Sequence, residues 1–240
     1  MKLDGQGLLV LVDPVRTSGV EAAEIGRQAK AAGVRGLLIG SSFDGAAQTH
    51  EVARALRTHA PGIPVALFPG SAMQLTDQVD LVLFLSLVSG RNPQYLIEEH
   101  VRAVPFLQQH PVATLSTAYI LIDGGRVTSV ESVSQTRPLP ADKPELAAAH
   151  ATAALLIGMQ AVYLEAGSGA ERPVPLDIIR ACRSAVPPPP PDRPLFVGGG
   201  IRTPEQARAA RAAGADFVVI GTVVEEGAKH DLRAFVEAAR

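Results

Sequence analysis

A short stretch beyond the middle of the chain joins an apolar run to a glycine-rich loop and reads Tyr163-Leu164-Glu165-Ala166-Gly167-Ser168-Gly169-Ala170. The residues before it, Met159, Ala161 and Val162, are apolar and predict a buried strand. Glu165 therefore ends a strand, and the glycines after it leave backbone amides open to an anion. A carboxylate beside an anion site is typical of a base acting on a phosphorylated substrate. Taken alone, the stretch also fits a surface turn with a solvated glutamate.

The same alternation of apolar runs and helical segments extends along the chain. Strands are expected at residues 8–12, 34–39, 64–68, 81–87, 112–122, in the run ending at Glu165, and at 195–197 and 217–220. Helices are expected at residues 19–32, 46–59, 93–109, 143–156, 175–185, 204–213 and 225–239. Eight such units predict an α/β protein, a (β/α)8 TIM barrel in a single domain over residues 1–240. A doubly wound sheet is the alternative, but no G-x-G-x-x-G follows the first strand.

Two segments depart from this regular alternation. The connection between Phe68 and Asp80 is too short for a full crossover helix. We therefore expect a modified TIM barrel with a truncated or missing third helix. Five consecutive prolines at residues 187–191 predict a stiff polyproline spacer before the seventh strand.

The composition excludes several classes of protein. The net charge of −2 argues against nucleic-acid binding, which usually shows a basic excess. Cys182 is the only cysteine, which excludes an internal disulfide and a cysteine metal site. No apolar run approaches the ~18 residues of a membrane span, and a first strand near Gly7 leaves no room for a signal peptide. We expect a cytoplasmic protein with at most peripheral membrane contact.

Three glycine-rich loops follow the last strands: Gly167-Ser168-Gly169, Gly198-Gly199-Gly200 and Gly221-Thr222. In a (β/α)8 barrel the active site lies at the carboxyl ends of the strands, and the last loops often bind phosphate. Backbone amides, helix N-termini and the hydroxyls of Ser168 and Thr222 would together surround a phosphate dianion. Tight-turn glycines are the simpler alternative for any one of these loops.

The first two strands end in oxygen-bearing side chains. Asp13 ends the first strand and Gly40-Ser41-Ser42 ends the second. A carboxylate and a hydroxyl suit a hard cation such as Mg2+, which takes its other ligands from water and phosphates. Asp13 also fits a turn-former before Pro14. Two anion sites, one of them assisted by metal, suit two phosphorylated substrates, of which one loses a diphosphate.

The chain resembles the geranylgeranylglyceryl phosphate synthase family over nearly its whole length. The matching motifs are Val12-Asp13-Pro14, Ser89-Gly90-Arg91-Asn92-Pro93, Leu121-Ile122-Asp123-Gly124-Gly125, Pro138-Leu139-Pro140, Val197-Gly198-Gly199-Gly200-Ile201-Arg202, Ile220-Gly221-Thr222 and the octapeptide at residues 163–170. The octapeptide is specific, whereas the G-G-G-I and G-T elements recur in many phosphate-binding barrels. The family has a modified TIM barrel without a normal third helix.

The resemblance implies an Mg2+-dependent prenyltransferase. Such an enzyme joins a polyprenyl diphosphate, typically geranylgeranyl, to the 3-hydroxyl of sn-glycerol 1-phosphate and releases diphosphate. Asp13 and Ser42 would be the magnesium ligands, and Glu165 would orient or deprotonate the attacking hydroxyl. The implied glycerol phosphate site comprises Tyr163, Leu164, Glu165, Ala166, Gly167, Ser168, Gly169, Gly199, Gly200, Gly221 and Thr222.

Two positions depart from the family pattern. Val15 and Arg16 follow the Asp-Pro pair where many relatives have an acidic residue and Lys. Gly40-Ser41-Ser42 replaces the usual Gly-Gly-Ser or Gly-Gly-Thr, so that either serine could face the metal, although alignment favours Ser42. An apolar prenyl tail also needs an apolar groove, for which the candidates are Phe68, Met73, Leu85 and Tyr119, each of which also fits an ordinary core.

Three other classes of protein share part of this pattern: a phosphosugar isomerase or lyase, a flavin-dependent barrel and a non-catalytic phosphate-binding protein. The lysines, Lys2, Lys30, Lys143 and Lys229, are not at strand ends, which disfavours Schiff-base chemistry. A non-catalytic protein gives no reason for Glu165 and Asp13 both to end strands. We expect a homo-oligomer, because this fold often assembles.

Overall fold

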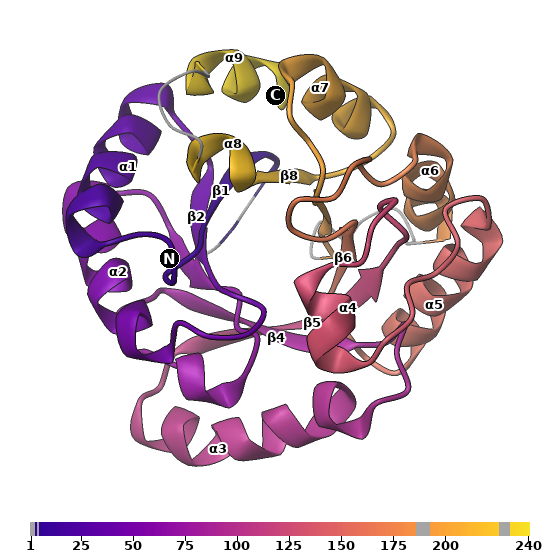
Figure 1. Cartoon of the computed structure of the whole chain (residues 1–240), viewed down its shortest axis with the longest axis horizontal. Coiled ribbons are helices and arrows are strands. Elements are labelled where there is room, and N and C mark those ends of the chain that lie inside the picture. The colour runs from indigo at the N-terminus through magenta and orange to yellow at the C-terminus, as the bar shows by residue number, and fades with distance from the viewer. Residues whose placement is uncertain (1–2, 4, 186–192, 226–230) are drawn as a thin grey trace.

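The structure of the chain is a computed structural model that describes residues 3, 5–185, 193–225 and 231–240. Eight parallel strands form a closed barrel in chain order, with β8 paired to β1 (Figure 1). The strands are β1 (Gly7–Val12), β2 (Gly36–Ile39), β3 (Val65–Leu67), β4 (Leu81–Leu87), β5 (Ala113–Leu121), β6 (Ala161–Glu165), β7 (Leu195–Gly198) and β8 (Phe217–Ile220). The predicted (β/α)8 fold is therefore confirmed.

Helices surround this barrel and also cover part of one end. They are α1 (Gly19–Ala32), α2 (Ala46–His59), α3 (Glu99–Gln109), α4 (Ser129–Ser134), α5 (Pro144–Leu156), α6 (Leu176–Ala185), α7 (Pro204–Ala212), α8 (Thr222–Glu225) and α9 (Leu232–Ala238), with a short 3-10 helix η1 (Ala72–Gln74) and a π-helical turn η2 (Gln94–Glu98). Local sequence sets several starts: Ser18 caps α1 in a capping box with Glu21, and Thr203 does the same for α7 with Gln206.

One predicted helix needs correction, two helices were not predicted, and one predicted spacer lies outside the described residues. The predicted closing helix at 225–239 is wrong as a single element, because Asp231 has an extended backbone and α9 begins at Leu232. Helices α4 and α8 were not predicted, since six and four residues are too short for a clear helical period. The proline run at 187–191 lies outside the described residues.

Alternation of side chains along the strands divides the core into two parts. One set faces the helices and is mainly aliphatic, for example Val162 and Leu164 of β6. The other fills the barrel and includes stacked aromatic rings, with Tyr163 lying 4.8 Å from Phe68 and 5.7 Å from Phe196 between ring centroids. The side chain of Tyr163 thus belongs to the inner layers of the barrel, next to the residue that ends β6.

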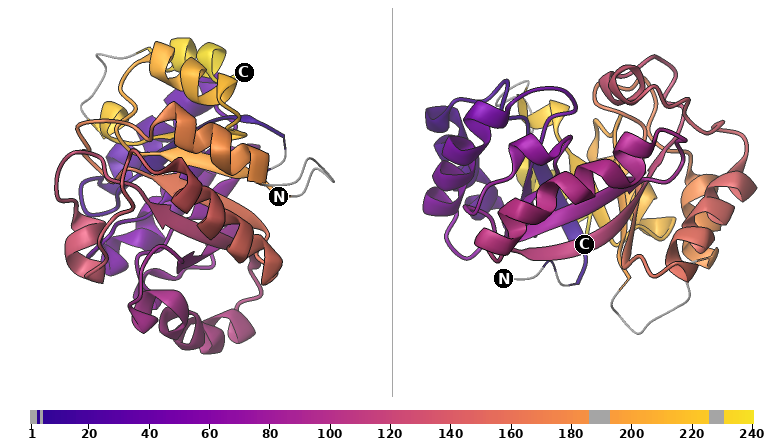
Figure 2. Two further views of the ribbon diagram at one scale, coloured as in Figure 1. Left: turned by 90° about the vertical axis from the view of Figure 1, so that its right-hand side faces the viewer. Right: turned by 90° about the horizontal axis from the view of Figure 1, so that it is seen from below.

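The third connection is truncated, as predicted. Only η1 lies between β3 and β4, and β3 pairs with β4 at two positions, whereas β4 pairs with β5 at seven. The carboxyl-terminal half of β4 therefore has an unpaired edge on the side of β3. Helix α3 lies diagonally across this wall of the barrel (Figure 2). All of α3 is described, and Ala103 alone among its residues is buried, so this helix packs loosely.

No helix in the described part of the chain combines the length and hydropathy that a bilayer span requires.

Candidate active site

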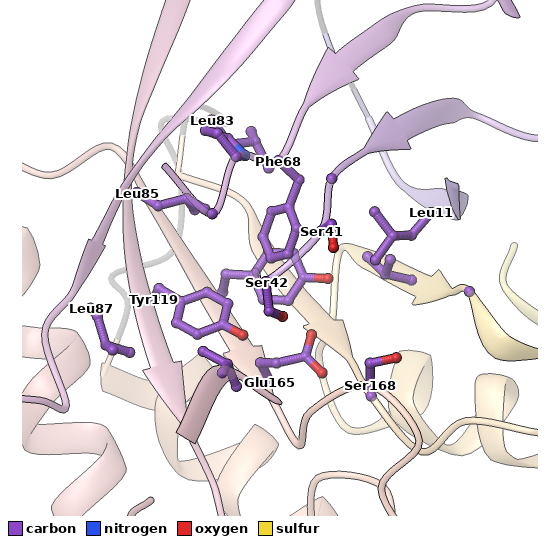
Figure 3. A pocket seen from close by; sticks show the side chains of 18 of the residues that line it. Leu11, Ser41, Ser42, Phe68, Leu83, Leu85, Leu87, Tyr119, Glu165 and Ser168 are labelled. Carbon is purple, nitrogen blue, oxygen red and sulfur yellow. The ribbon is translucent and has the colours of Figure 1, made fainter. Parts of the chain in front are cut away.

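A single pocket at the carboxyl ends of the strands receives side chains or backbone from every strand end. Figure 3 shows Glu165, Tyr119 and Ser42 pointing into it. Most of the residues singled out from the sequence line it: Asp13, Ser41, Ser42, Tyr163, Glu165, Ser168, Gly169, Gly199, Gly200, Gly221 and Thr222. Asp13 and Glu165, which come from opposite sides of the barrel, therefore share one cavity. The three glycine-rich loops also meet there, as expected for loops that follow neighbouring parallel strands.

Leu164, Ala166 and Gly167 are not among the pocket-lining residues. The side chains of Leu164 and Ala166 are buried in the outer core, because they alternate with Tyr163 and Glu165 along the chain. Gly167 is also buried, and its N–H donates a hydrogen bond to Glu165 Oε1. Any contribution of Leu164 or Ala166 to ligand binding would have to come from the backbone.

Glu165 is a buried carboxyl group, with only 5% of its surface exposed. Burial raises the pKa of Glu165 from 4.5 to about 7, against the opposing effects of the Gly167 N–H, whose hydrogen bond of 2.6 Å favours the carboxylate, and of the Tyr163 hydroxyl. A group with this pKa exists in both protonation states near neutral pH. It can therefore accept a proton from a substrate hydroxyl and release it again.

Two tyrosines lie beside this carboxyl group. Burial, together with the charge of Glu165, raises the pKa of Tyr119 and Tyr163 well above 10, so both remain phenols at neutral pH. A Cβ placed on Gly198 would lie 2.5 Å from the Tyr163 hydroxyl and 2.9 Å from Glu165 Oε2, so these two groups flank one point. The Tyr163 hydroxyl faces the Glu165 carboxyl group, although among the described residues it makes no hydrogen bond in good geometry. Tyr163 is fully buried, so a shift of its ring or of Glu165 would be needed for the hydroxyl to reach a ligand oxygen.

The loop after β7 requires glycine next to the carboxyl group. Gly199 has φ of +80°, and a Cβ there would collide with Glu165 Oε1 and approach the backbone nitrogens of Ala166 and Gly167 to 2.8 and 2.7 Å. Any side chain at this position would therefore displace Glu165 and crowd two amides that are already bonded, Gly167 N–H to Glu165 and Ala166 N–H to the carbonyl of Gly198. Gly199 and Gly200 themselves line the pocket, and backbone amides of such a loop can form an anion site without a basic side chain.

Oxygen-bearing groups also gather on the opposite side of the pocket. Asp13 Oδ1 accepts a hydrogen bond of 2.9 Å from the Val15 N–H, and both Ser41 and Ser42 line the cavity. The backbone carbonyl of Ser41 is fixed by the Gln74 side-chain amide at 2.9 Å. The described residues contain no cluster of three or more His, Cys, Asp or Glu side chains suited to a metal. One carboxylate with serine hydroxyls fits Mg2+, a hard ion that keeps most of its ligands as water or phosphate oxygens.

The pocket continues away from Glu165 as an apolar branch that the sequence revealed only in part. Phe68, Leu85 and Tyr119 line the pocket as expected, whereas Met73 does not, since its side chain is 80% exposed. The further residues of this branch come from β4, α3 and α4: Val82, Leu83, Phe84, Leu87, His100, Ala103, Val130 and Val133. The unpaired edge of β4 allows the branch to pass from the barrel interior toward α3.

Two contacts hold α3 beside this branch. His100 Nε2 lies 2.6 Å from the carbonyl of Leu85, and its ring stacks on Phe84 with centroids 4.2 Å apart. Glu99 Oε2 accepts the Ala72 N–H at 2.7 Å and so joins α3 to η1. The short third connection was the only sequence signal for this opening, because the alternation along β4 does not show which side chains border a cavity.

The fold and the pocket together define a TIM barrel whose strand ends bring glycine-rich loops, a buried carboxyl group and an apolar branch into one cavity. A profile of the PcrB family matches residues 2–239, and the chain therefore belongs to that family. The resemblance to the geranylgeranylglyceryl phosphate synthases is confirmed by relatives carrying that name.

Two of these relatives come from bacteria. The chain is 40% identical over 226 residues to the geranylgeranylglyceryl phosphate synthase of Zunongwangia profunda, covering 94% of each protein. It is 38% identical over 217 residues to that of Chitinophaga pinensis, covering 90% of this chain and 84% of the relative. The chain is also similar to a solved structure, the crystal structure of (S)-3-O-geranylgeranylglyceryl phosphate synthase from Thermoplasma acidophilum in complex with sn-glycerol-1-phosphate. The TM-score is 0.89 and the sequence identity is 31%, and the match covers 98% of this chain and 93% of that one.

Proposed function

We propose that this protein is a prenyltransferase that joins a polyprenyl diphosphate, geranylgeranyl diphosphate in the first instance, to the 3-hydroxyl of sn-glycerol 1-phosphate. Membership of the family and the names of its relatives support this proposal. The observation that carries it is the position of Glu165, a buried carboxyl group with a pKa of about 7 in a pocket that is rich in glycine amides on one side and apolar on the other. A polar phosphate ester and an apolar chain would meet at that carboxyl group.

The glycerol phosphate would occupy the side formed by the last three strand ends. Its phosphate would bind the loops that contain Ser168, Gly199 and Thr222, and its hydroxyls would face Glu165 and Tyr163. The Tyr163 phenol can donate a hydrogen bond to a glycerol oxygen, which would orient the attacking hydroxyl. Holding the alcohol in this way lowers the entropic part of the barrier.

The reaction transfers one prenyl group to oxygen. The 3-oxygen of the glycerol forms a bond with C1 of the prenyl chain, while the bond between C1 and the diphosphate oxygen breaks and the diphosphate leaves with the electron pair. The proton of the attacking hydroxyl passes to Glu165. Apolar side chains such as Phe68 and Leu85 would exclude water from the allylic carbon, because attack by water there would hydrolyse the prenyl diphosphate.

Asp13 and Ser42 would hold Mg2+ at the other side of the pocket, with Ser41 as the alternative hydroxyl. When bound, Mg2+ would neutralise the negative charge that develops on the departing diphosphate. The hard oxygen donors present there support this assignment. The homo-oligomer and the cytoplasmic location expected from the sequence are part of the same proposal, and gel filtration and cell fractionation test them.

The proposal is tested by identifying the product. The enzyme is incubated with Mg2+, sn-glycerol 1-phosphate and prenyl diphosphates of increasing length, and mass spectrometry is used to find the prenyl glyceryl ether. The enantiomer, sn-glycerol 3-phosphate, is the matched control and should react poorly, as should mixtures with EDTA. Absence of an ether with every chain length would contradict the proposal, and a coloured flavoprotein would point to the flavin-dependent alternative.

A further inference from the structure

Exposed apolar side chains gather around the open end of the barrel. Val15, Phe43, Met73, Ile97 and Val127 follow β1, β2, β3, β4 and β5 respectively, and all five are exposed. Segments that follow parallel strands of one barrel emerge at the same end. Phe43 and Met73 are 79% and 80% exposed, which is unusual for side chains of this size. These five residues form an apolar rim.

Close contacts join neighbouring members of the apolar rim. A Cβ on Gly45 would lie 3.2 Å from Val15 Cγ2, so Val15 borders the loop that carries Phe43. The Gln74 side chain donates to the carbonyl of Asp44 at 2.7 Å, which fixes η1 and Met73 against that same loop. The rim is therefore a connected surface over β1 to β3, and the bond from Ala72 to Glu99 extends it to the start of α3.

The apolar rim borders the apolar branch of the pocket. Ser42 and Ala72 line the pocket, and each is the neighbour in sequence of an exposed rim residue, Phe43 or Met73. A prenyl chain gains about 0.8 kcal/mol per buried CH2 on entering a bilayer, so a long prenyl diphosphate resides in lipid rather than in water. An entrance surrounded by apolar side chains would accept such a chain directly from lipid.

Basic side chains accompany the rim, although the whole chain has a net charge of −2. Arg16, Arg91 and Arg126 are exposed on the segments after β1, β4 and β5, against two exposed acidic residues, Asp44 beside Phe43 and Glu98 beside Ile97. Each arginine near an anionic membrane surface contributes about 1 kcal/mol of attraction. Positive charge around an apolar patch complements anionic lipid headgroups better than it complements another copy of this acidic chain.

We propose that the apolar rim docks on an anionic phospholipid bilayer, with Phe43 and Met73 inserted between the headgroups. The open end of the barrel then faces the membrane, and the prenyl diphosphate enters the apolar branch without crossing water. The identity of the entering chain rests on the proposed function. The docking itself does not, because it is measured without substrate.

Vesicle flotation tests the docking. Wild-type protein is mixed with vesicles of phosphatidylcholine and phosphatidylglycerol, and the floating fraction gives a partition coefficient. The double substitution Phe43→Ser with Met73→Ser should lower this coefficient roughly ten-fold, since two of the inserting side chains are lost. The matched control is Leu156→Ser with Ile157→Ser, at 83% and 76% exposure. These residues end the helix that precedes β6, so they lie at the opposite end of the barrel, and their loss should leave flotation unchanged.

A second pair of variants tests the role of charge. Arg91→Gln with Arg126→Gln should remove most of the preference for vesicles containing phosphatidylglycerol over vesicles of phosphatidylcholine alone. Arg208→Gln with Arg233→Gln, which changes two exposed arginines on other segments, should retain that preference. Raising the salt concentration should reduce the preference of the wild type, because surface charges are screened.

Several results would overturn the proposal. Wild-type protein that stays with neither kind of vesicle would do so, as would equal loss of flotation in the rim variant and its control. A change of subunit number in the Phe43→Ser, Met73→Ser protein, seen by gel filtration, would assign the rim to contacts between copies instead. Turnover of a short, water-soluble prenyl diphosphate should be the same in this variant and the wild type. Absence of turnover in the wild type and in every variant would contradict the proposed function, whereas the flotation result would still stand.

Discussion

The two sides of the pocket are constructed by different means. On the side of β6 to β8, backbone amides, glycines and one buried carboxyl group form the site, and a single Cβ at Gly199 would collide with it. On the side of β3 to β5, the site is apolar and exists because β4 lacks a neighbour over half its length. Substitutions on the first side should therefore abolish function abruptly, whereas those on the second should change substrate preference gradually.

The most severe loss is expected for Glu165→Gln. Glutamine retains the shape of the side chain but cannot accept a proton, and general bases contribute about 10²- to 10⁴-fold to rate. We expect kcat for ether formation to fall by about three orders of magnitude, with a normal circular-dichroism spectrum. Measurement of single turnovers with sn-glycerol 1-phosphate and geranylgeranyl diphosphate checks this.

The control for this variant is Glu131→Gln, a glutamate on α4 outside the residues that line the pocket. It should retain wild-type turnover. A Glu165→Gln protein with turnover within a factor of ten of the wild type would remove Glu165 from the proton transfer and, with it, the assignment of chemistry to this side of the pocket.

The same carboxyl group should make stability depend on pH. Its pKa is about 7 when folded and near 4.5 when unfolded, so the native state binds the proton more tightly. The native state therefore loses stability as pH rises from about 4.5 to about 7, by up to about 3 kcal/mol. Urea unfolding should find Glu165→Gln more stable than wild type by about that amount at pH 8 and little different at pH 4.5. An equal difference in unfolding free energy between the two proteins at both pH values would show that burial does not raise the pKa of Glu165.

The anion side was largely predictable from the sequence, and the reason is physical. Its amides belong to glycine-rich loops, which can be recognised directly in the sequence. In a (β/α)8 barrel, a Glu that ends a strand lies at the mouth of the barrel. Leu164 and Ala166 were included because the resemblance implied the whole motif, although alternation with an inward Glu165 turns both side chains toward the outer core.

Gly199→Ala tests how closely the anion side is packed. The new methyl group would collide with the Glu165 carboxylate, and we expect kcat/KM for glycerol phosphate to fall by about 10²-fold. Gly158→Ala is the matched control: its φ of +99° imposes similar backbone strain, yet no heavy atom lies within 4 Å of the added Cβ. Gly158→Ala should lose about 1 kcal/mol of stability from backbone strain alone, Gly199→Ala should lose more because of the collision, and only Gly199→Ala should lose activity. Parallel activity losses would mean that strain, rather than contact with Glu165, is responsible.

The apolar side was only half predictable. The short third connection indicated a missing helix, and Phe68, Leu85 and Tyr119 were correctly placed in the pocket. Met73 was misplaced, because the apolar character of a residue in a short connection does not show whether its side chain faces a cavity or solvent. Helix α4 was missed, and with it Val130 and Val133. A cavity between loosely packed elements depends on distances that no local pattern encodes.

The mildest of the four effects is expected for Ala103→Phe, which fills the branch between β4 and α3. Ala103 lines the pocket and is 3% exposed, so a larger side chain has to occupy space that a prenyl chain would use. We expect kcat/KM for geranylgeranyl diphosphate to fall about ten-fold relative to that for geranyl diphosphate, since a few methylene groups lose their contacts. Val101→Phe, on the exposed face of the same helix, should leave that ratio unchanged. The smaller Ala103→Leu should give an intermediate ratio, which distinguishes a filled cavity from a damaged fold. If all three proteins keep the wild-type ratio, the prenyl chain does not lie beside α3, and the apolar branch would have to be assigned to something other than substrate.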